Sequence, residues 1–385
     1  MTVPLPPSAS IVIIGGGIMG VAAAYYLAEA GVEDIVVIER DQLGSGSTCK
    51  AAGGLRTQFS DETNIMLGAR SLETFRRFKT DFDTDLDLVT SGYLFLLDND
   101  ADAAAFERNV ELQRSLGQSS RMLTVSEAHE LSPVISTSGL VAAAFNPEDA
   151  HCTPEAAVSG FACAARKRGV TFVQNCEVTD IVTTGDEIHG VTTSKGEIAT
   201  SHVVCAAGAW SQRIGEMAGV DLPVTPLRRH VAVTEPVDFD ATKLPFTIDF
   251  TTSFYFHSEC RGLLMGAPEV EDVRDFNLHT DPAWLDRLAE LIEHRAPALG
   301  DVGIGKGWAG LYECTPDHNA LIGTAAQLPG FIYATGFSGH GFLQGPAVGE
   351  VVRDLYLGRE PFVDVSGLSV ERFDREELRV EMNVV

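Results

Sequence analysis

Two short apolar runs near the start of the chain flank a glycine-rich segment. The runs cover 11–14 and 35–38, and each has the length and the β-branched composition of a buried strand. Gly15, Gly17 and Gly20 follow the first run, and small and apolar residues then continue over a length typical of a helix. The pattern therefore predicts a strand, a glycine turn, a helix and a second strand in about thirty residues.

Farther along the chain, strand-like and helix-like patterns are interleaved. Apolar or alternating runs predict strands over 93–97, 227–235, 253–257, 263–266 and 331–334, and a strand from Val203 that ends in Ala206-Ala207-Gly208. Helical spacing predicts helices over 102–116 and 282–295, the second with Trp284, Leu285, Leu288, Leu291 and Ile292 along one face. A further helix is expected to begin near 344–346, with Pro346 in its first turn.

Glycine-rich apolar segments recur at four distant places, 44–54, 203–210, 319–323 and 331–349. This arrangement predicts an α/β fold in which a Rossmann-type nucleotide-binding domain is assembled from separated segments. We expect that domain to comprise 1–90, 140–222 and 308–385. An inserted α+β substrate domain, built on an antiparallel sheet, is expected to comprise 91–139 and 223–307.

Composition narrows the function classes. The 385 residues carry a formal net charge of −26, from 54 acidic and 28 basic residues. That balance argues against a nucleic-acid partner and against an anionic membrane surface, and it means that an acidic substrate must be bound by local arginines. The seven cysteines form no CxxC motif, which is typical of a reduced, cytoplasmic protein without a structural metal.

The first glycine segment has the chemistry of a dinucleotide site. Gly15 permits the tight turn, Gly17 lets a pyrophosphate approach the backbone, and Gly20 lets the helix lie close to the strand. Glu39 ends the second apolar run, where a carboxylate accepts hydrogen bonds from a ribose. The alternative is a membrane anchor, because no charge occurs from 2 to 28. The glycines would interrupt such a helix and no basic residue precedes it, so we expect no membrane span.

A second glycine loop favours FAD over NAD. In 331–349, a strand is followed by Gly336, Gly339 and Gly341 and then by a helix start. A second helix N-terminus points unsatisfied N–H groups at an electron-rich group. A flavin dinucleotide benefits from this second site, because its reduced ring carries negative charge at the pyrimidine edge.

These residues resemble the FAD-dependent amino acid and amine oxidoreductase family, which includes D-amino acid oxidase, glycine oxidase and sarcosine oxidase. The resemblance runs from Ile11 to about Phe373. It is carried by the glycine motif with Glu39, GSTCKAAGGLRTQ at 46–58, VVCAAGAW at 203–210, LYECTPDHNALIG at 311–323 and ATGFSGHGF at 334–342. Within the family, the chain is most similar to the sarcosine oxidase β-subunit and dimethylglycine dehydrogenase, which oxidise N-substituted glycines or other secondary and tertiary amino acids.

The resemblance implies a function and a set of site residues. The function is oxidation of the C–N bond of a secondary or N-methyl amino acid to an imine, with dioxygen or a redox partner as the electron acceptor. The residues expected to bind FAD are Gly15, Gly17, Ile18, Met19, Gly20, Glu39, Arg40, Ser47, Thr48, Lys50, Ala52, Gly53, Gly54, Val178, Ala207, Gly208, Trp210, Gly310, Gly339, His340, Gly341, Phe342 and Leu343.

Four residues are candidates for the chemistry, each with a structural alternative. Arg56 matches the arginine that binds the substrate carboxylate, although it could instead form an internal ion pair. His340 could contact flavin or substrate, or stabilise the loop by a hydrogen bond. Tyr255 could cover the substrate or pack in the core. Lys50 could hold a flavin carbonyl or a water, or be an exposed surface ammonium.

Three departures from the family pattern matter. Gly310 occupies the position of the cysteine that binds FAD covalently in monomeric sarcosine oxidase, and Lys50 occupies that of the histidine used by dimethylglycine dehydrogenase. Non-covalent FAD is therefore expected. Leu264 falls near the place of the oxygen-activating lysine, which puts reaction with dioxygen in doubt. Leu343 replaces a second carboxylate-binding lysine, so the binding site for the substrate carboxylate is expected to be weaker or to be formed by other residues.

Two other functions remain open on the sequence. One is a 2-hydroxy acid dehydrogenase of the same fold, which would also use Arg56. The other is a non-catalytic FAD-binding subunit or assembly factor.

Overall fold

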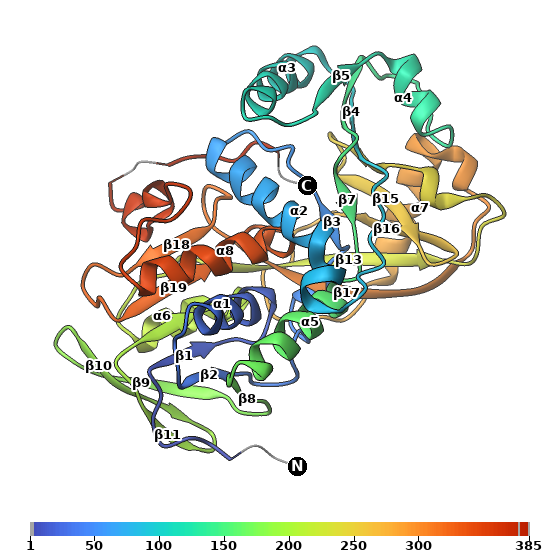
Figure 1. Ribbon diagram of the computed structural model, residues 1–385. Helices are drawn as coiled ribbons and strands as arrows, with labels where there is room; N and C mark the ends of the chain where they lie inside the picture. Colours follow the sequence, from blue (N-terminus) through green and yellow to red (C-terminus); the bar gives the residue numbers. More distant parts are fainter. Residues whose placement is uncertain (1–3, 376–377, 384–385) are drawn as a thin grey trace.

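A six-stranded sheet forms the first layer of the computed structural model, which describes residues 4–375 and 378–383 (Figure 1). The strand order is β18-β19-β12-β1-β2-β8. The strands are β1 (Ile11–Ile14), β2 (Ile35–Ile38), β8 (Thr171–Val173), β12 (Val203–Cys205), β18 (Leu321–Thr324) and β19 (Phe331–Thr335). Neighbouring strands are parallel except for the antiparallel pair β18 and β19. The sheet thus joins segments that lie far apart in the sequence, as the Rossmann-type prediction requires.

Both faces of this sheet are buried, which is why its strands are apolar throughout. Ile11 and Ile13 face a core that they share with four helices, whereas Val12 and Ile14 face a second core. The four helices are α1 (Ile18–Glu29), α2 (Glu62–Phe82), α5 (Pro154–Lys167) and α8 (Gly341–Tyr356). The second core contains helix α6 (Ser211–Met217) and a three-stranded antiparallel sheet of β9 (Val178–Thr184), β10 (Glu187–Thr193) and β11 (Gly196–Ala199).

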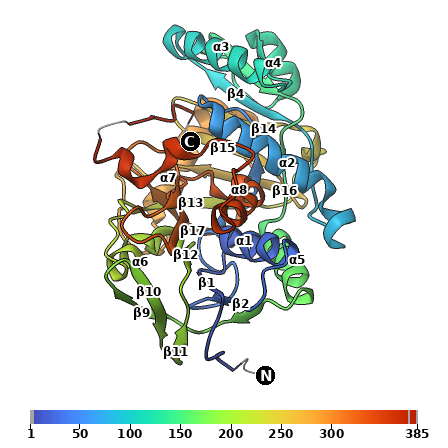
Figure 2. The same ribbon diagram turned by 60° about the vertical axis from the view of Figure 1, so that its left-hand side comes forward.

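Helices α1 and α8 pack closely because α8 presents glycines to α1. A Cβ atom at Gly345 would lie 2.5 Å from the Cγ1 atom of Ile18, and one at Gly349 would lie 2.8 Å from the carbonyl carbon of Ala22. Larger residues at these positions would push the helices apart. The close contact brings the N-termini of both helices to one side of the sheet (Figures 1 and 2).

An eight-stranded sheet forms the second layer, in the order β17-β13-β16-β15-β14-β4-β6-β5. Its strands are β4 (Tyr93–Leu97), β5 (Arg121–Leu123), β6 (Ala142–Asn146), β13 (Thr225–Thr234), β14 (Phe246–Asp249), β15 (Phe254–Glu259), β16 (Gly262–Ala267) and β17 (Ile304–Cys314). All neighbours are antiparallel except β14 and β4. The helices beside it are α3 (Asp100–Ser115), α4 (Val125–Leu131) and α7 (Pro282–Arg295), and a short ribbon of β3 (Gly54–Leu55) and β7 (Ala150–His151) completes the strands. Strand β6 lies wholly outside the predicted insert and β17 extends beyond it, so the domain boundaries stay a proposal.

Two local predictions were wrong. Helix α8 begins at Gly341, so Pro346 lies inside the helix rather than in its first turn. The turn at Gly339, where φ is 99°, leads directly into the helix and starts it earlier than the proline suggested. In α7, Leu285 is 43% exposed, whereas Trp284, Leu288, Leu291 and Ile292 are buried. The apolar stripe of α7 is therefore narrower than the sequence indicated.

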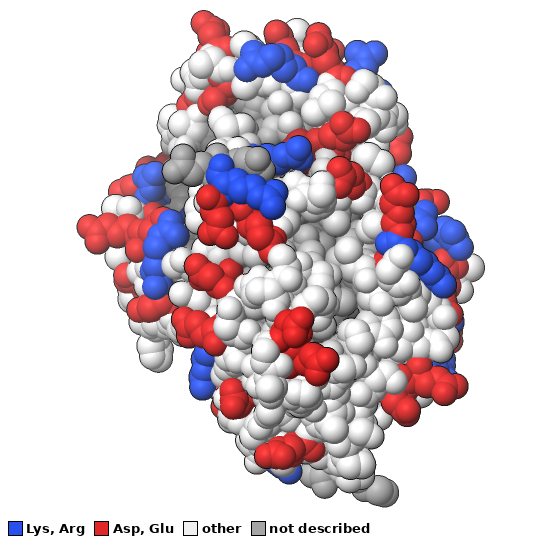
Figure 3. Space-filling view, turned by 90° about the vertical axis from the view of Figure 1, so that its left-hand side faces the viewer, with Lys and Arg blue, Asp and Glu red and all other residues white. Residues whose placement is uncertain are grey.

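The surface reflects the acidic composition. Acidic side chains are spread over the face in Figure 3, among smaller groups of basic ones. None of the helices within residues 4–375 and 378–383 combines the length and the apolarity that a bilayer-spanning segment needs.

Candidate functional site

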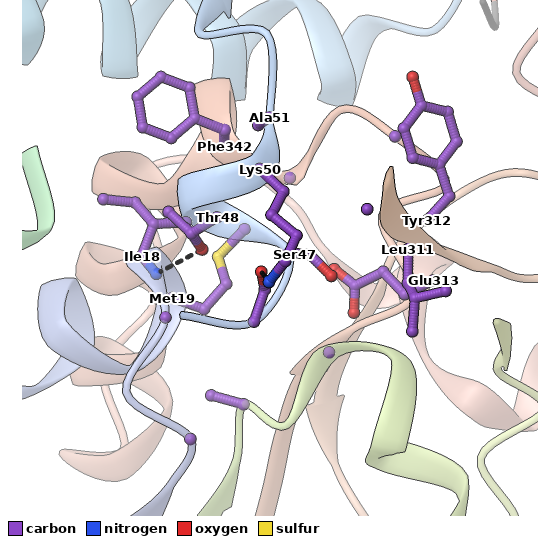
Figure 4. Close-up of a pocket in the computed structure, with 18 of the residues that line it drawn as sticks. Ile18, Met19, Ser47, Thr48, Lys50, Ala51, Leu311, Tyr312, Glu313 and Phe342 are labelled. Carbon is purple, nitrogen blue, oxygen red and sulfur yellow. Dashed lines mark hydrogen bonds between the residues drawn. The ribbon is translucent and has the colours of Figure 1, made fainter. Parts of the chain in front are cut away.

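A large pocket lies where the two sheets meet the glycine turns (Figure 4). It holds about 1990 Å³ of empty space, its open mouth included. Its lining runs from Gly17 and Glu39 to Arg56 and Tyr255, so one continuous pocket contains both the predicted cofactor residues and the predicted substrate residues. Of the residues predicted to bind the cofactor or to act in the chemistry, all line the pocket except Gly20.

In the first glycine turn, Gly15 and Gly20 are closely packed against the backbone, whereas Gly17 borders the open pocket. Gly15 has φ of 112°, and a Cβ atom there would lie 2.2 Å from the carbonyl oxygen of Ala206. At Gly20 a Cβ atom would lie 1.9 Å from the Gly15 oxygen, so Gly20 allows the helix to sit close to the strand and does not line the pocket. At Gly17 a Cβ atom would meet only the Oγ1 atom of Thr48, at 3.0 Å. Gly17 is thus the glycine that leaves space for a ligand.

Two helix N-termini face the pocket without side-chain caps. Helices α1 and α8 have no capping hydrogen bond from a side chain and no acidic residue in the first turn. Helices α5 and α6 also lack a side-chain cap, whereas α2, α3, α4 and α7 are capped by Asp61, Asn99, Thr124 and Asp281. Uncapped N–H groups in a cavity bind anionic or electron-rich groups, so the pocket fits a pyrophosphate at α1 and a flavin pyrimidine edge at α8.

Glu39 lines the end of this pocket that is predicted to hold the ribose. Its carboxylate accepts hydrogen bonds from the backbone N–H groups of Gly16, at 2.7 Å, and Asp41, at 2.8 Å. These bonds hold the carboxylate against the glycine turn, and its lone pairs remain accessible from the pocket.

Replacing Glu39 with alanine is expected to weaken FAD binding by roughly 1.5–3 kcal/mol, the scale of hydrogen bonds to a charged group. Fluorescence titration of the apoprotein with FAD measures the effect. Glu39→Gln keeps the size of the side chain and one acceptor, so it should fall between wild type and alanine. Equal affinity of all three proteins would exclude a ribose contact.

Lys50 is half-buried rather than exposed. Its ammonium donates hydrogen bonds to the carbonyl oxygens of Ser45 and Gly46, and burial lowers its pKa. A Cβ atom at Gly310 would lie 3.0 Å from the Cβ atom of Lys50, so the two residues are direct neighbours in the wall of the pocket. Figure 4 shows Lys50 and Glu313 extending into the pocket from opposite walls.

The cysteines are poorly placed for a flavin thioether. Cys176 lines the pocket beside Glu177 and Val178, at the end predicted for adenine, whereas Cys49 and Cys314 are not among the lining residues. Burial also raises the pKa values of the Cys49 and Cys314 thiols to about 11. The described residues thus fit non-covalent FAD.

Arg56 supplies a buried guanidinium at the other end of the pocket. Its Nη1 donates to the Gln58 oxygen at 2.5 Å, its Nη2 donates to the Asn383 oxygen at 2.6 Å, and its guanidinium carbon lies 4.1 Å from the centre of the Phe59 ring. The side chain is 6% exposed, yet no carboxylate among residues 4–375 and 378–383 forms an ion pair with it. Burial lowers the pKa of Arg56, whereas the Glu381 and Asp149 carboxylates attract this guanidinium from beyond ion-pair distance and act against that lowering, so the described chain forms no direct ion pair with Arg56.

His340 and Tyr255 lie near this end and are uncharged. Burial lowers the pKa of His340 to about 3, and its Nε2 atom has no hydrogen-bond partner in the part of the chain that the structure describes. The predicted loop-stabilising hydrogen bond through that atom is thus absent there. Tyr255 lines the pocket and stacks on Phe246 with ring centres 5.4 Å apart, and burial raises its pKa.

Several lining residues were missed by the sequence analysis: Tyr93, Arg229, Phe246, Ile248, Tyr312 and Glu313. Glu313 accepts hydrogen bonds from the Thr335 hydroxyl at 2.9 Å and the Gly336 N–H at 3.1 Å, and burial raises its pKa to about 7. The pairing of β13 with β17 places Arg229 opposite Gly310 and near Tyr312, and the pairing of β14 with β4 places Phe246 opposite Tyr93. Those long-range registers leave no local signal in the sequence.

Comparisons with known proteins agree with this geometry. Residues 10–355 match the family described as DAO, FAD dependent oxidoreductase. Human mitochondrial sarcosine dehydrogenase is 30% identical over 96% of this chain and 42% of its own length, so the chain spans about two fifths of that protein. FAD-dependent oxidoreductase domain-containing protein 1 of Xenopus laevis is 31% identical over 99% of this chain and 86% of its own length.

Solved structures give the same result for the fold. L-proline dehydrogenase from P. horikoshii superimposes with a TM-score of 0.92 at 35% identity, covering 97% of this chain and all (100%) of the other. Glycine oxidase from Geobacillus kaustophilus superimposes with a TM-score of 0.85 at 24% identity, covering 95% and 99%. The second likeness concerns the fold alone.

Proposed function

This chain belongs to the FAD dependent oxidoreductase family, and from that membership and the pocket we propose that it oxidises the C–N bond of a secondary or N-methyl amino acid to an imine. Two relatives support this substrate class by their names, sarcosine dehydrogenase and L-proline dehydrogenase, at 30% and 35% identity over nearly the whole chain. One acts on an N-methyl amino acid and the other on a cyclic secondary amino acid.

Arg56 is the single observation that carries the proposal. A guanidinium offers five N–H donors in a planar fork that matches a carboxylate, and two of its nitrogens here bind only backbone oxygens. A buried cation is costly, and the Glu381 and Asp149 carboxylates attract Arg56 only from beyond ion-pair distance. The carboxylate of a substrate in direct contact would offset more of that cost. We therefore assign Arg56 to the substrate carboxylate.

The residues around Arg56 favour a neutral amine at the reacting position. Burial raises the pKa values of Tyr93, Tyr255 and Tyr312 and lowers that of His340, so these groups carry no charge near neutral pH. The Arg56 guanidinium disfavours a second cation beside it, which promotes loss of the proton from the substrate ammonium. Glu313 lines the same pocket, and burial raises its pKa to about 7. The flavin, when bound, accepts two electrons as a hydride from the carbon next to nitrogen. The aromatic side chains position that carbon and exclude water.

Dye-linked turnover tests this proposal. The holoprotein is incubated with sarcosine, N-methyl-L-alanine or L-proline and an artificial electron acceptor, and the products are identified by mass spectrometry. We expect dye reduction with equimolar formation of the demethylated amine, or of the cyclic imine from proline. Turnover of 2-hydroxy acids alone would contradict the proposal, and so would the absence of turnover with every amine.

We expect the purified protein to be yellow and to release its FAD into the supernatant when precipitated with trichloroacetic acid. The reason is Gly310, where a thioether cysteine would stand, together with the position of Cys176 at the far end of the pocket. Absorbance of the supernatant and of the pellet gives the answer. Flavin retained in the pellet would refute non-covalent binding and direct attention to Lys50, Cys49 or His151.

Electron transfer to dioxygen is expected to be slower than transfer to the dye. Leu264, which matches the oxygen-activating lysine by resemblance, is buried in an apolar cluster with Val231 and Val233. An apolar side chain offers no positive charge to stabilise reduced oxygen species. Parallel assays of peroxide formation and dye reduction measure the ratio, and peroxide production at the full rate of turnover would contradict this expectation.

A further inference from the structure

Arg229 is a second guanidinium in the pocket, supplied by β13 next to Arg228. Successive residues of a strand point to opposite faces, and the two arginines differ accordingly. Arg228 forms a bidentate pair with Glu269, at 2.7 and 2.8 Å, in which both side chains are less than a tenth exposed. Arg229 instead lines the pocket, with its guanidinium carbon 5.7 Å from the centre of the Tyr312 ring.

The hydrogen-bond partners of Arg229 leave its guanidinium group able to bind a ligand. Its Nη1 atom donates to the Arg228 oxygen at 3.1 Å and to the Asp272 carboxylate at 3.2 Å. The Asp272 side chain is 43% exposed and also pairs with Arg274, at 3.0 Å. Ion pairs in contact with water contribute little, about 0–1 kcal/mol, so a ligand can displace Asp272 from Arg229. In the described chain, Nε and Nη2 of Arg229 form no hydrogen bond to the protein.

Tyr312 connects Arg229 with Arg56. Burial raises the pKa of the Tyr312 phenol, and the Arg229 and Arg56 guanidinium groups each lower it by a smaller amount. Both guanidinium groups therefore lie within electrostatic range of the same hydroxyl group. One end of the pocket therefore holds two cations. Within residues 4–375 and 378–383, the direct ion pair of these two cations is that of Arg229 with Asp272 of an exposed loop, whereas Glu381 and Asp149 attract Arg56 from beyond ion-pair distance.

We propose that the substrate is a dicarboxylic N-substituted amino acid, whose α-carboxylate binds Arg56 and whose second carboxylate displaces Asp272 from Arg229. This inference rests on the proposed function, which it makes more specific. The net charge of −26 repels a dianion at long range, so capture requires two local guanidinium groups. Arg229 already binds one carboxylate, supplied by the protein itself, which indicates the ligand chemistry that it accepts.

Matched pairs of ligands test the proposal on the holoenzyme. The flavin spectrum is followed during titration with succinate or glutarate and, for comparison, with butyrate, none of which can be oxidised as an amine. Anaerobic flavin bleaching is then compared for iminodiacetate and sarcosine, and for N-methyl-L-aspartate and N-methyl-L-alanine. We expect each dicarboxylate to bind or react about three- to tenfold better than its monocarboxylate partner, because the Arg229 side chain is only partly removed from water and its new pair replaces the one with Asp272.

Three variants assign the preference to Arg229. Arg229→Gln should abolish most of the ratio between dicarboxylate and monocarboxylate, and Arg229→Lys should recover part of it. Asp272→Asn, which removes the competing carboxylate, should increase the affinity for succinate. Arg274→Gln is the control, because Arg274 pairs with Asp272 but does not line the pocket. Thermal melting of each holoprotein shows whether the variants remain folded.

The outcomes separate this inference from the proposed function. If monocarboxylic amines bleach the flavin as well as dicarboxylic ones, or if Arg229→Gln leaves the ratio unchanged, the two-arginine site is wrong while the proposed function stands. If succinate binds through Arg229 but no amine bleaches the flavin, the two-anion site stands and the proposed function is wrong.

Discussion

Replacing Gly17 with aspartate is expected to give a folded protein that has lost FAD. A side chain at this position would meet only the Thr48 hydroxyl, so the fold should tolerate it. It would project into the space next to the N-terminus of α1, where the pyrophosphate is expected. A carboxylate beside a pyrophosphate costs several kcal/mol, so affinity for FAD should fall on the order of a hundredfold or more.

Two glycine-to-alanine variants serve as controls for this result. Gly17→Ala adds one methyl group and no charge, so it should weaken FAD binding much less. Gly15→Ala should instead destabilise the apoprotein, because its Cβ atom would overlap the Ala206 oxygen and its φ of 112° is strained for alanine. FAD titration and thermal melting of the apoproteins distinguish the two effects. Normal FAD affinity in Gly17→Asp would show that the pyrophosphate binds elsewhere.

Replacing Arg56 with alanine is expected to lower kcat/KM for an amino acid substrate. The decrease should correspond to a loss of roughly 2–5 kcal/mol in transition-state stabilisation, the cost of leaving one member of a buried charge pair alone. The flavin spectrum should be preserved, because Arg56 is assigned to the substrate. Arg56→Lys should recover only part of the activity, since an ammonium lacks the fork geometry.

The structure adds a control for the Arg56 experiment. Arg56 also donates to the Gln58 and Asn383 oxygens, so alanine could destabilise the local structure. Thermal melting of the holoprotein measures that effect separately from catalysis. Near-normal efficiency of Arg56→Ala on the best acidic substrate would contradict the assignment and favour a simple amine as substrate.

The parts of the site that sequence predicts well are local. The glycine turn, the first helix and Glu39 follow one another within thirty residues of chain, so their spacing alone carries the geometry. Family resemblance extended the site to the segments around Lys50, Gly208 and Gly339, all of which line the pocket. Their roles in binding and catalysis remain proposals.

The parts that sequence did not predict depend on pairing between distant strands. Arg229 and Tyr312 meet only because β13 pairs with β17, about eighty residues later in the chain. The environment of Lys50 likewise depends on tertiary contact, since Gly310 faces it from β17. The periodicity of α7 predicted an apolar face that included Leu285, but Leu285 is exposed. The neighbouring structure, which the periodicity does not contain, decides how wide a face of an amphipathic helix is buried.

Anaerobic titration of the holoprotein with secondary amino acids distinguishes amine oxidation from hydroxy acid oxidation at this flavin site. The panel contains sarcosine, L-proline, iminodiacetate and N-methyl-L-aspartate, with L-lactate and L-2-hydroxyglutarate as hydroxy acid controls. We expect that at least one of the amines bleaches the oxidised flavin absorbance completely and that Arg56→Ala slows this reduction. Bleaching by a hydroxy acid and by none of the amines would contradict it, and so would a flavin that no substrate reduces.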